Sequence, residues 1–225
     1  MSYLLIILAA TVLPGLFFVW LINYFDRFNR EPANVIFKLF LAGLATPLPA
    51  VILEYILAPF ISSTLINAFV GVAMPEEGVK LALILYFIKR NKSFDEILDG
   101  AVYAIAVSMG FAVTENIMYV FGSSNPFSLA LIRSFTAIPL HALAAGFMGL
   151  AVARKKIESS GSVAGAYLTA VAIHGAYDYF LMEPLIPSFF SIILVIVLWI
   201  VLVKKIRKAR RDDFIAGRFF HHDNG

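Results

Sequence analysis

Seven apolar stretches divide almost the whole chain, and each is long enough or nearly long enough to cross the hydrocarbon core of a bilayer as a helix. They lie at about 2–25, 39–60, 65–88, 100–121, 128–152, 163–181 and 187–203. A lipid-facing backbone must satisfy its own hydrogen bonds, and these runs lack the alternation of a membrane barrel. The predicted fold class is therefore an all-α, polytopic integral membrane helix bundle with about seven transmembrane helices.

The apolar content excludes a water-soluble domain. Hydrophobic residues make up 60% of the 225 residues and charged residues only 15%, with a mean hydropathy of +0.85. In water such side chains would form large exposed apolar patches, whereas lipid accommodates them. We expect one transmembrane domain over residues 1–203 and a basic tail over 204–225. The absence of cysteine excludes disulfides, thiolate metal sites and a cysteine nucleophile.

The basic residues alternate between the predicted connectors. Connectors 26–38, 89–99 and 153–162 hold three Lys or Arg each and the tail holds seven, whereas 61–64, 122–127 and 182–186 hold none. Cytoplasmic connectors of membrane proteins are enriched in Lys and Arg, so we expect the N-terminus outside and the C-terminus in the cytoplasm. The tail is predicted to contact the lipid bilayer rather than nucleic acid.

Ionisable side chains nevertheless lie inside the apolar stretches, where each costs a few kcal/mol unless it is paired, protonated or hydrated. They include Glu54, Glu76, Glu77, Lys80, Glu115, His141, His174 and Asp178. A single one, such as Glu54, is as well explained as a polar contact between helices. The set taken together favours a functional site.

The segment around Pro75 predicts a discontinuous helix. Glu76 and Lys80 are four residues apart and share a helix face, while Glu77 points about 100° away. We therefore expect Lys80 to neutralise Glu76 and leave Glu77 available. Pro75 lacks a backbone donor, so both glutamates should begin a new half-helix, whose free N–H groups stabilise a carboxylate. Discontinuous helices of this kind mark binding sites at membrane depth.

Spacing also connects the later polar residues. His174 and Asp178 are four apart, so the carboxylate can hold the imidazole ring and set its tautomer. His141 follows Pro139 by two residues, which predicts a distorted helix beside it. At about 1.5 Å per residue, these groups and the glutamates reach depths that one cavity can contain. We expect this cavity to open on the extracytoplasmic side.

Two chemistries use carboxylates and imidazoles inside a membrane. One is hydrolysis, in which a glutamate activates water and a histidine or a metal acts on the scissile carbonyl. The other is ion or proton transport, because Asp, Glu and His chains also relay protons. The chain has no H-E-x-x-H or G-x-S-x-G motif, and Tyr177-Asp178 has no G-x-G-D partner for an aspartyl protease.

The motifs in chain order resemble the PrsW family of membrane proteases. They are Glu76-Glu77-x-x-Lys80, Phe111-x-x-x-Glu115-Asn116, His141 and His174-x-x-x-Asp178, with Asp26 to Pro32 and Asp99 to Tyr103 as further matches. This family is distantly related to the type II CAAX prenyl endopeptidases and to the scaffold subunit of γ-secretase. Lys80 and Glu115 differ from the CAAX pattern of E-E-x-x-x-R and F-x-x-x-H, which argues against prenylated substrates.

The resemblance implies a membrane endopeptidase of the cytoplasmic membrane that makes the first, extracytoplasmic cut in a single-pass anti-sigma factor and so induces a stress response. The roles expected are Glu76 or Glu77 as general base and His174 with Asp178 for the oxyanion or a metal, with Glu115 and His141 completing the site. Family members are grouped with metalloproteases, so Glu115, His141 and His174 are predicted to bind Zn²⁺. Metal-free carboxylate catalysis and a non-catalytic scaffold remain alternatives.

Overall fold

All regular secondary structure is helical in the computed structural model, which describes residues 2–26 and 29–218. The elements are α1 (Ser2–Phe25), α2 (Ala33–Ala45), α3 (Pro47–Leu57), η1 (Ala58–Phe60), α4 (Thr64–Ile66), η2 (Asn67–Ala73), α5 (Met74–Arg90), α6 (Ile97–Phe121), α7 (Pro126–Phe135), α8 (Ala137–Glu158), α9 (Val163–Met182) and α10 (Phe189–Ile215). No strand occurs within these two ranges. The predicted all-α bundle is confirmed.

Helix α6 forms the centre of the bundle. Most of its residues are buried, and it packs against α8, α2 and α1. The backbones of α6 and α8 approach closely at two glycines, since a Cβ added to Gly100 would lie 2.2 Å from the carbonyl oxygen of Gly149. Helices α1 and α10 instead expose large apolar side chains such as Trp20 and Ile196. Such surfaces fit contact with lipid.

Five helical runs are long and apolar enough to cross a membrane: Tyr3–Phe25, Ala33–Phe60, Ile97–Phe121, Pro126–Glu158 and Phe189–Ile215. Two further runs, 64–90 and 163–182, coincide with predicted stretches but are not among these five. They carry the buried ionisable residues of the candidate site, which lower the hydropathy of a segment. The count of seven and the orientation of the termini therefore stay predictions.

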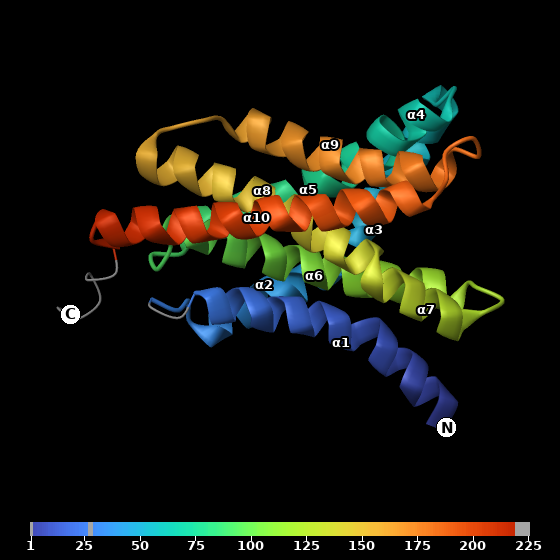
Figure 1. Cartoon of the computed structure of the whole chain (residues 1–225), viewed down its shortest axis with the longest axis horizontal. Coiled ribbons are helices and arrows are strands. Elements are labelled where there is room, and N and C mark those ends of the chain that lie inside the picture. The colour runs from blue at the N-terminus through green and yellow to red at the C-terminus, as the bar shows by residue number, and fades with distance from the viewer. Residues whose placement is uncertain (1, 27–28, 219–225) are drawn as a thin grey trace.

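The connectors gather at two opposite ends of the bundle (Figure 1). Connectors 91–96 and 159–162 and the C-terminal end of α10 lie at one end, and connectors 122–125 and 183–188 lie at the other. Helix α10 continues past residue 203 to Ile215. Its buried Asp213 accepts hydrogen bonds from the N–H groups of Ile97 and Leu98, which joins this extension to the start of α6.

Three interruptions in the helices position the polar residues. Thr46 separates α2 from α3, and Thr136 separates α7 from α8 just before His141, as the nearby Pro139 predicts. The π-helical segment η2 ends immediately before α5, in whose first turn Pro75 lies. A proline ring clashes with the carbonyl four residues earlier, and widening the preceding turns relieves that clash.

Candidate functional site

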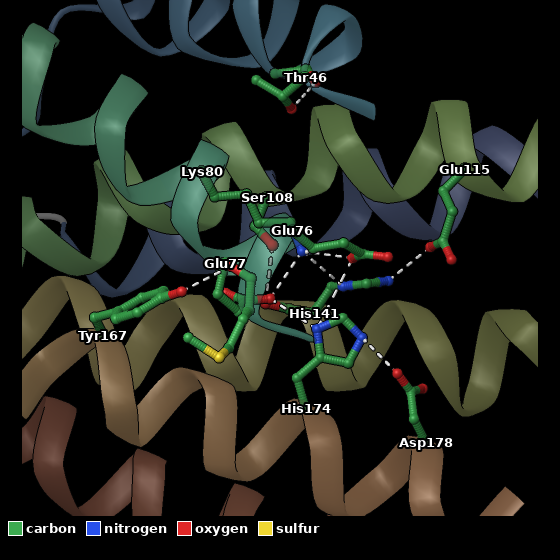
Figure 2. Close-up of polar contacts among 12 residues, drawn as sticks. Thr46, Glu76, Glu77, Lys80, Ser108, Glu115, His141, Tyr167, His174 and Asp178 are labelled. Atoms are coloured by element: carbon green, nitrogen blue, oxygen red, sulfur yellow. Dashed lines mark hydrogen bonds and ion pairs between the residues drawn. The ribbon is translucent and has the colours of Figure 1, made fainter. Parts of the chain in front are cut away.

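Glu76 and Glu77 lie in the first turn of α5 and share one buried ammonium group. Lys80 Nζ contacts both carboxylates (Figure 2), at 3.1 Å from Glu76 Oε2 and 2.8 Å from Glu77 Oε1. The Lys80 side chain has no exposed surface. The expectation that Lys80 neutralises Glu76 alone is wrong. Positions three and four residues apart both face each other on a helix, so one lysine reaches both carboxylates.

The Lys80 ammonium also contacts two residues of neighbouring helices. Its Nζ atom lies 3.3 Å from His141 Nδ1 and 3.9 Å from the centre of the Phe111 ring. A cation over an aromatic face is stabilised by the negative potential of the ring. Phe111, which is four residues before Glu115, therefore holds the lysine as well as packing in the core. An ammonium has no acceptor, so His141 Nδ1 is unprotonated in this contact.

His174 lies between two carboxylates. Its Nδ1 atom is 2.9 Å from Glu77 Oε1, and its Nε2 atom is 3.3 Å from Asp178 Oδ2 (Figure 2). The second contact is the one that the four-residue spacing predicts. The rings of His141 and His174 meet edge to face, with centroids 5.0 Å apart. The imidazole of His174 is thus fixed in orientation from both sides.

Glu115 connects His141 to a residue that the sequence did not single out. Glu115 Oε2 lies 2.8 Å from His141 Nε2 and 2.9 Å from a terminal nitrogen of Arg133. The Arg133 guanidinium also lies over the Tyr119 ring and donates from Nε to Asn116 Oδ1. An isolated arginine inside an apolar stretch is itself a signal of function. That signal was present in the sequence, but no motif included Arg133.

Two cavities reach these side chains. One of about 260 Å³ is lined by Glu54, Glu76, Glu115, Met118 and Tyr119 among others. The second, of about 190 Å³, is lined by Glu76, Glu115, Arg133, His141, His174, Asp178 and residues up to Leu181 and Met182. Glu76 and Glu115 line both cavities, whereas Glu77 lines neither. Both cavities reach Tyr119 near the end of α6, and the smaller one also reaches Leu181 and Met182 at the end of α9. The connectors that follow these two helices, 122–125 and 183–188, contain no Lys or Arg.

The donor atoms that can hold a metal differ in part from the predicted ligands. Glu76, Glu77, His141 and His174 are all buried and offer ligand atoms within 4.8 Å of one another. Glu115 lies beside this group, because Arg133 holds its carboxylate on the far side of His141. Glu77 Oε2 is buried and has no hydrogen-bond partner within the described residues. Two imidazoles and two carboxylates suit Zn²⁺, so these residues fit a divalent metal.

The structure thus brings together the residues singled out from the sequence, namely Glu76, Glu77, Glu115, His141, His174 and Asp178. They come from α5, α6, α8 and α9. The half-buried Glu54 of α3 lines the larger cavity rather than packing between helices. The geometry shows which groups meet and leaves the catalytic role of each as a prediction.

The sequence is similar to known proteins over most of its length. The profile described as "PrsW family intramembrane metalloprotease" matches residues 31–203. Protease PrsW of Geobacillus kaustophilus (strain HTA426) is 29% identical over 212 residues, covering 91% of this chain and 92% of the relative. Protease PrsW of Clostridioides difficile (strain 630) is 31% identical over 210 residues, covering 88% of each chain. That of Bacillus subtilis (strain 168) is 28% identical over 218 residues, covering 91% and 95%. No solved structure matches the chain.

Proposed function

Because the chain belongs to the PrsW family of intramembrane metalloproteases, and is a membrane protease, we propose that it cuts a single-pass membrane protein such as an anti-sigma factor. The cut is the first, extracytoplasmic one, made in the cytoplasmic membrane. The observation that carries this proposal is the position of Glu76, a buried carboxylate that lines both cavities beside His141 and His174. A carboxylate with access to a cavity and imidazoles at hand is the arrangement that general-base hydrolysis requires.

Glu76 is the general base of the proposed mechanism. It takes a proton from a water molecule in the cavity, and the resulting hydroxide attacks the scissile carbonyl carbon. Glu77 has a different role, since it is fully buried between Lys80 and His174 and lines neither cavity. It positions the imidazole of His174 together with Asp178. Glu76 is therefore the base, and Glu77 is a positioning residue.

Positive and hydrogen-bonding groups around the cavity stabilise the charge that develops. Arg133 and His174 both line the smaller cavity, where an oxyanion formed on the substrate would lie within their reach. His141 accepts from Lys80 at Nδ1 and donates to Glu115 from Nε2; it gives the Nε2 proton to the leaving amine and regains one from the proton that Glu76 took from water. Glu76, Glu77, His141 and His174 would hold Zn²⁺, which lowers the pKa of a bound water and polarises a carbonyl when present.

An apolar groove supports a membrane-spanning substrate. A hollow of about 520 Å³ between α3, η2, α5 and α9 is lined by Leu53, Ile56, Leu57, Val70, Met74, Pro75, Gly78, Val79, Ala82 and Tyr167. Pro75 of this groove directly precedes Glu76. A hydrophobic helix lying in the groove would bring its end close to the base, as helix-in-groove recognition does elsewhere.

The test is cleavage of co-expressed single-pass regulators by the native chain and two variants. Glu76→Gln should lower cleavage by about 10²-fold or more, because an amide cannot accept the proton. Glu158→Gln, at the end of α8 far from the cavities, should cleave as the native chain does. Cleavage should also stop with a strong chelator and return with Zn²⁺. Undiminished cleavage by Glu76→Gln would contradict the proposed mechanism. Proton flux into liposomes that the native chain supports and Glu76→Gln does not would favour transport instead.

A further inference from the structure

Two connectors meet the start of α6 at the end of the bundle remote from the catalytic cavities. Glu31, in the connector before α2, accepts hydrogen bonds from the Tyr103 hydroxyl at 3.1 Å and the Ser93 hydroxyl at 2.8 Å. The proposed protease mechanism uses none of these residues. Polar contacts thus join the connector before α2, the connector after α5 and the first turns of α6. These contacts involve none of the catalytic residues.

Three carboxyl groups converge within this contact. Asp26, Glu96 and Asp99 offer oxygen atoms within 4.8 Å of one another, and their exposed fractions are only 2%, 0% and 1%. Asp26 directly follows α1, Glu96 directly precedes α6, and Asp99 lies in the first turn of α6. In a medium of low dielectric constant three carboxylates this close repel one another strongly and lose their hydration. Either protonation or a bound cation must relieve this repulsion.

The hydrogen bonds present do not satisfy the group. Asp99 Oδ2 accepts from the N–H groups of Asp95 and Glu96, and Asp26 Oδ2 accepts from that of Glu31. Glu96 accepts from the Asp99 N–H in a capping box and has Asn29 as a further side-chain partner, whereas the buried Asp99 Oδ1 has no hydrogen-bond partner among the described residues. The group therefore contains a buried carboxylate oxygen, Asp99 Oδ1, that no described residue satisfies.

We propose that Asp26, Glu96 and Asp99 bind a divalent, oxygen-preferring cation such as Mg²⁺. Its ligands are carboxylates alone, with no imidazole or thiolate, which is the donor set of Mg²⁺, Ca²⁺ and Mn²⁺ rather than of Zn²⁺. The ion ties the connector after α1 to the first turn of α6. Because α6 is the central helix of the bundle, an ion that fixes its first turn has a structural role. The ion is separate from the metal proposed for the catalytic site. The inference does not depend on the proposed substrate or mechanism.

The experiment measures Mn²⁺ binding to the full chain in detergent by electron paramagnetic resonance. All bound metal is removed before the measurement begins. Stoichiometric Zn²⁺ is added first, so that the histidine-containing group is filled. The native chain should bind Mn²⁺, release it to excess Mg²⁺ or Ca²⁺, and unfold at a higher temperature when any of the three is bound. The relative strength of competition by Mg²⁺ and Ca²⁺ identifies the preferred ion.

Two variants and one control locate the site. Glu96→Gln and Asp99→Asn should each weaken Mn²⁺ binding by about tenfold or more, since each removes a charged ligand. Asp212→Asn, which changes a carboxylate paired with Arg154 at the same end, should bind as the native chain does. Native binding that Mg²⁺ and Ca²⁺ fail to displace, or that survives in both ligand variants, overturns the proposal.

A basic side chain is the rival to a metal ion. Arg27 follows Asp26 in the sequence and lies outside the described residues. If Arg27 neutralised the three carboxylates, the native chain would bind no Mn²⁺, and Arg27→Gln would lower its unfolding temperature. Absence of Mn²⁺ binding by the native chain overturns the proposal whatever Arg27→Gln does, whereas Mn²⁺ binding retained in Arg27→Gln supports it.

Discussion

At the scale of single residues, the ammonium of Lys80 holds the catalytic cluster together. It contacts both glutamates of α5, His141 of α8 and the Phe111 ring of α6 without exposure to water. Lysine presents a compact point charge with three donors, and each donor has a partner here. Removing that charge would leave two carboxylates buried beside each other.

Lys80→Met should therefore destabilise the protein by about 3 to 5 kcal/mol, the usual cost of removing one member of a buried ion pair. Lys89→Met, in the last turn of α5 at an exposed position, is the matched control and should change stability little. Thermal and denaturant unfolding of both variants in detergent measures the difference. Equal stability of Lys80→Met and the native chain would show that the glutamates are neutral without the lysine.

A second residue prediction concerns pH. Burial raises the pKa of the Asp26 carboxyl from 3.8 to about 8; the Glu31 N–H lowers it, the charges of Glu96 and Glu31 raise it, and Arg30 lowers it. Asp99 faces the same group. Between pH 3.8 and about pH 8 the folded chain keeps a proton on Asp26 that the unfolded chain releases. The free energy of unfolding therefore falls as the pH rises through this range. In metal-free buffer the unfolding free energy should drop from about pH 5 to about pH 8.

The Asp26→Asn variant tests the origin of that drop. An amide does not titrate, so its stability should depend less on pH over the same range. Asp212→Asn keeps the Asp26 carboxyl and should retain the native slope. A slope that is unchanged in Asp26→Asn would assign the pH dependence to other groups.

Residue spacing allowed part of the site to be predicted and concealed the rest. The contact of His174 with Asp178 follows from a separation of four within one helix. The contact between Glu77 and His174, by contrast, joins residues 97 positions apart on α5 and α9, which no local pattern specifies. Arg133 was missed for the same reason, since its partner Glu115 lies on another helix. Motif resemblance supplied the set of residues, and packing decides which of them touch.

At the scale of helices, the crossing of α6 and α8 depends on the absence of side chains. A Cβ on Gly149 would lie 2.0 Å from the carbonyl oxygen of Gly100, a backbone atom that cannot move aside alone. Close approach of this kind is how small residues hold membrane helices together. Since α6 carries Glu115 and α8 carries His141, this crossing also sets the distance between two residues of the site.

Gly149→Ala should consequently destabilise the protein by about 1 to 3 kcal/mol, the typical cost of overpacking a core. The control is Gly122→Ala, just past α6, where an added Cβ meets its nearest atom, Met118 O, at 3.3 Å. Unfolding in detergent gives the stability of each. If Gly149→Ala proved as stable as Gly122→Ala, the two helices would have room to separate without cost.

Helix interruptions were predictable where a proline marks them. Pro75 and Pro139 lie beside η2 and the break at Thr136, respectively. The apolar pattern predicts one uninterrupted stretch at 39–60, although α2 ends before Thr46 and Pro47 opens α3. Pro47 lacks the N–H group that would bond the Gly43 carbonyl in a continuous helix, and this carbonyl accepts from the Thr46 hydroxyl at 2.6 Å. Such a local exchange of partners leaves the apolar pattern unchanged.

At the scale of the whole molecule, the charged connectors and the cavities lie at different ends. Connector 91–96 contains Lys92, and connector 159–162 follows the basic end of α8. Both connectors lie at the same end of the bundle (Figure 1). Both catalytic cavities reach the last turns of α6, and the smaller one also reaches the last turn of α9. Connectors 122–125 and 183–188, which follow these helices, contain neither Lys nor Arg. If the basic end is cytoplasmic, a substrate is cut from the extracytoplasmic side, so the orientation decides which part of a substrate is accessible.

The orientation prediction follows from the cost of moving charge across a membrane. Lys and Arg near helix ends are retained on the cytoplasmic side during insertion, and the basic end here includes Lys92 and Arg211. Reporters fused after Lys92 and after Arg211 should therefore read cytoplasmic, and one inserted at Ser124 should read external. The two basic-end fusions serve as controls for each other, because an even number of crossings separates them. A cytoplasmic signal at Ser124 would contradict both the orientation and the crossing of the membrane by α6, and would place the catalytic cavities on the wrong side for an extracytoplasmic cut.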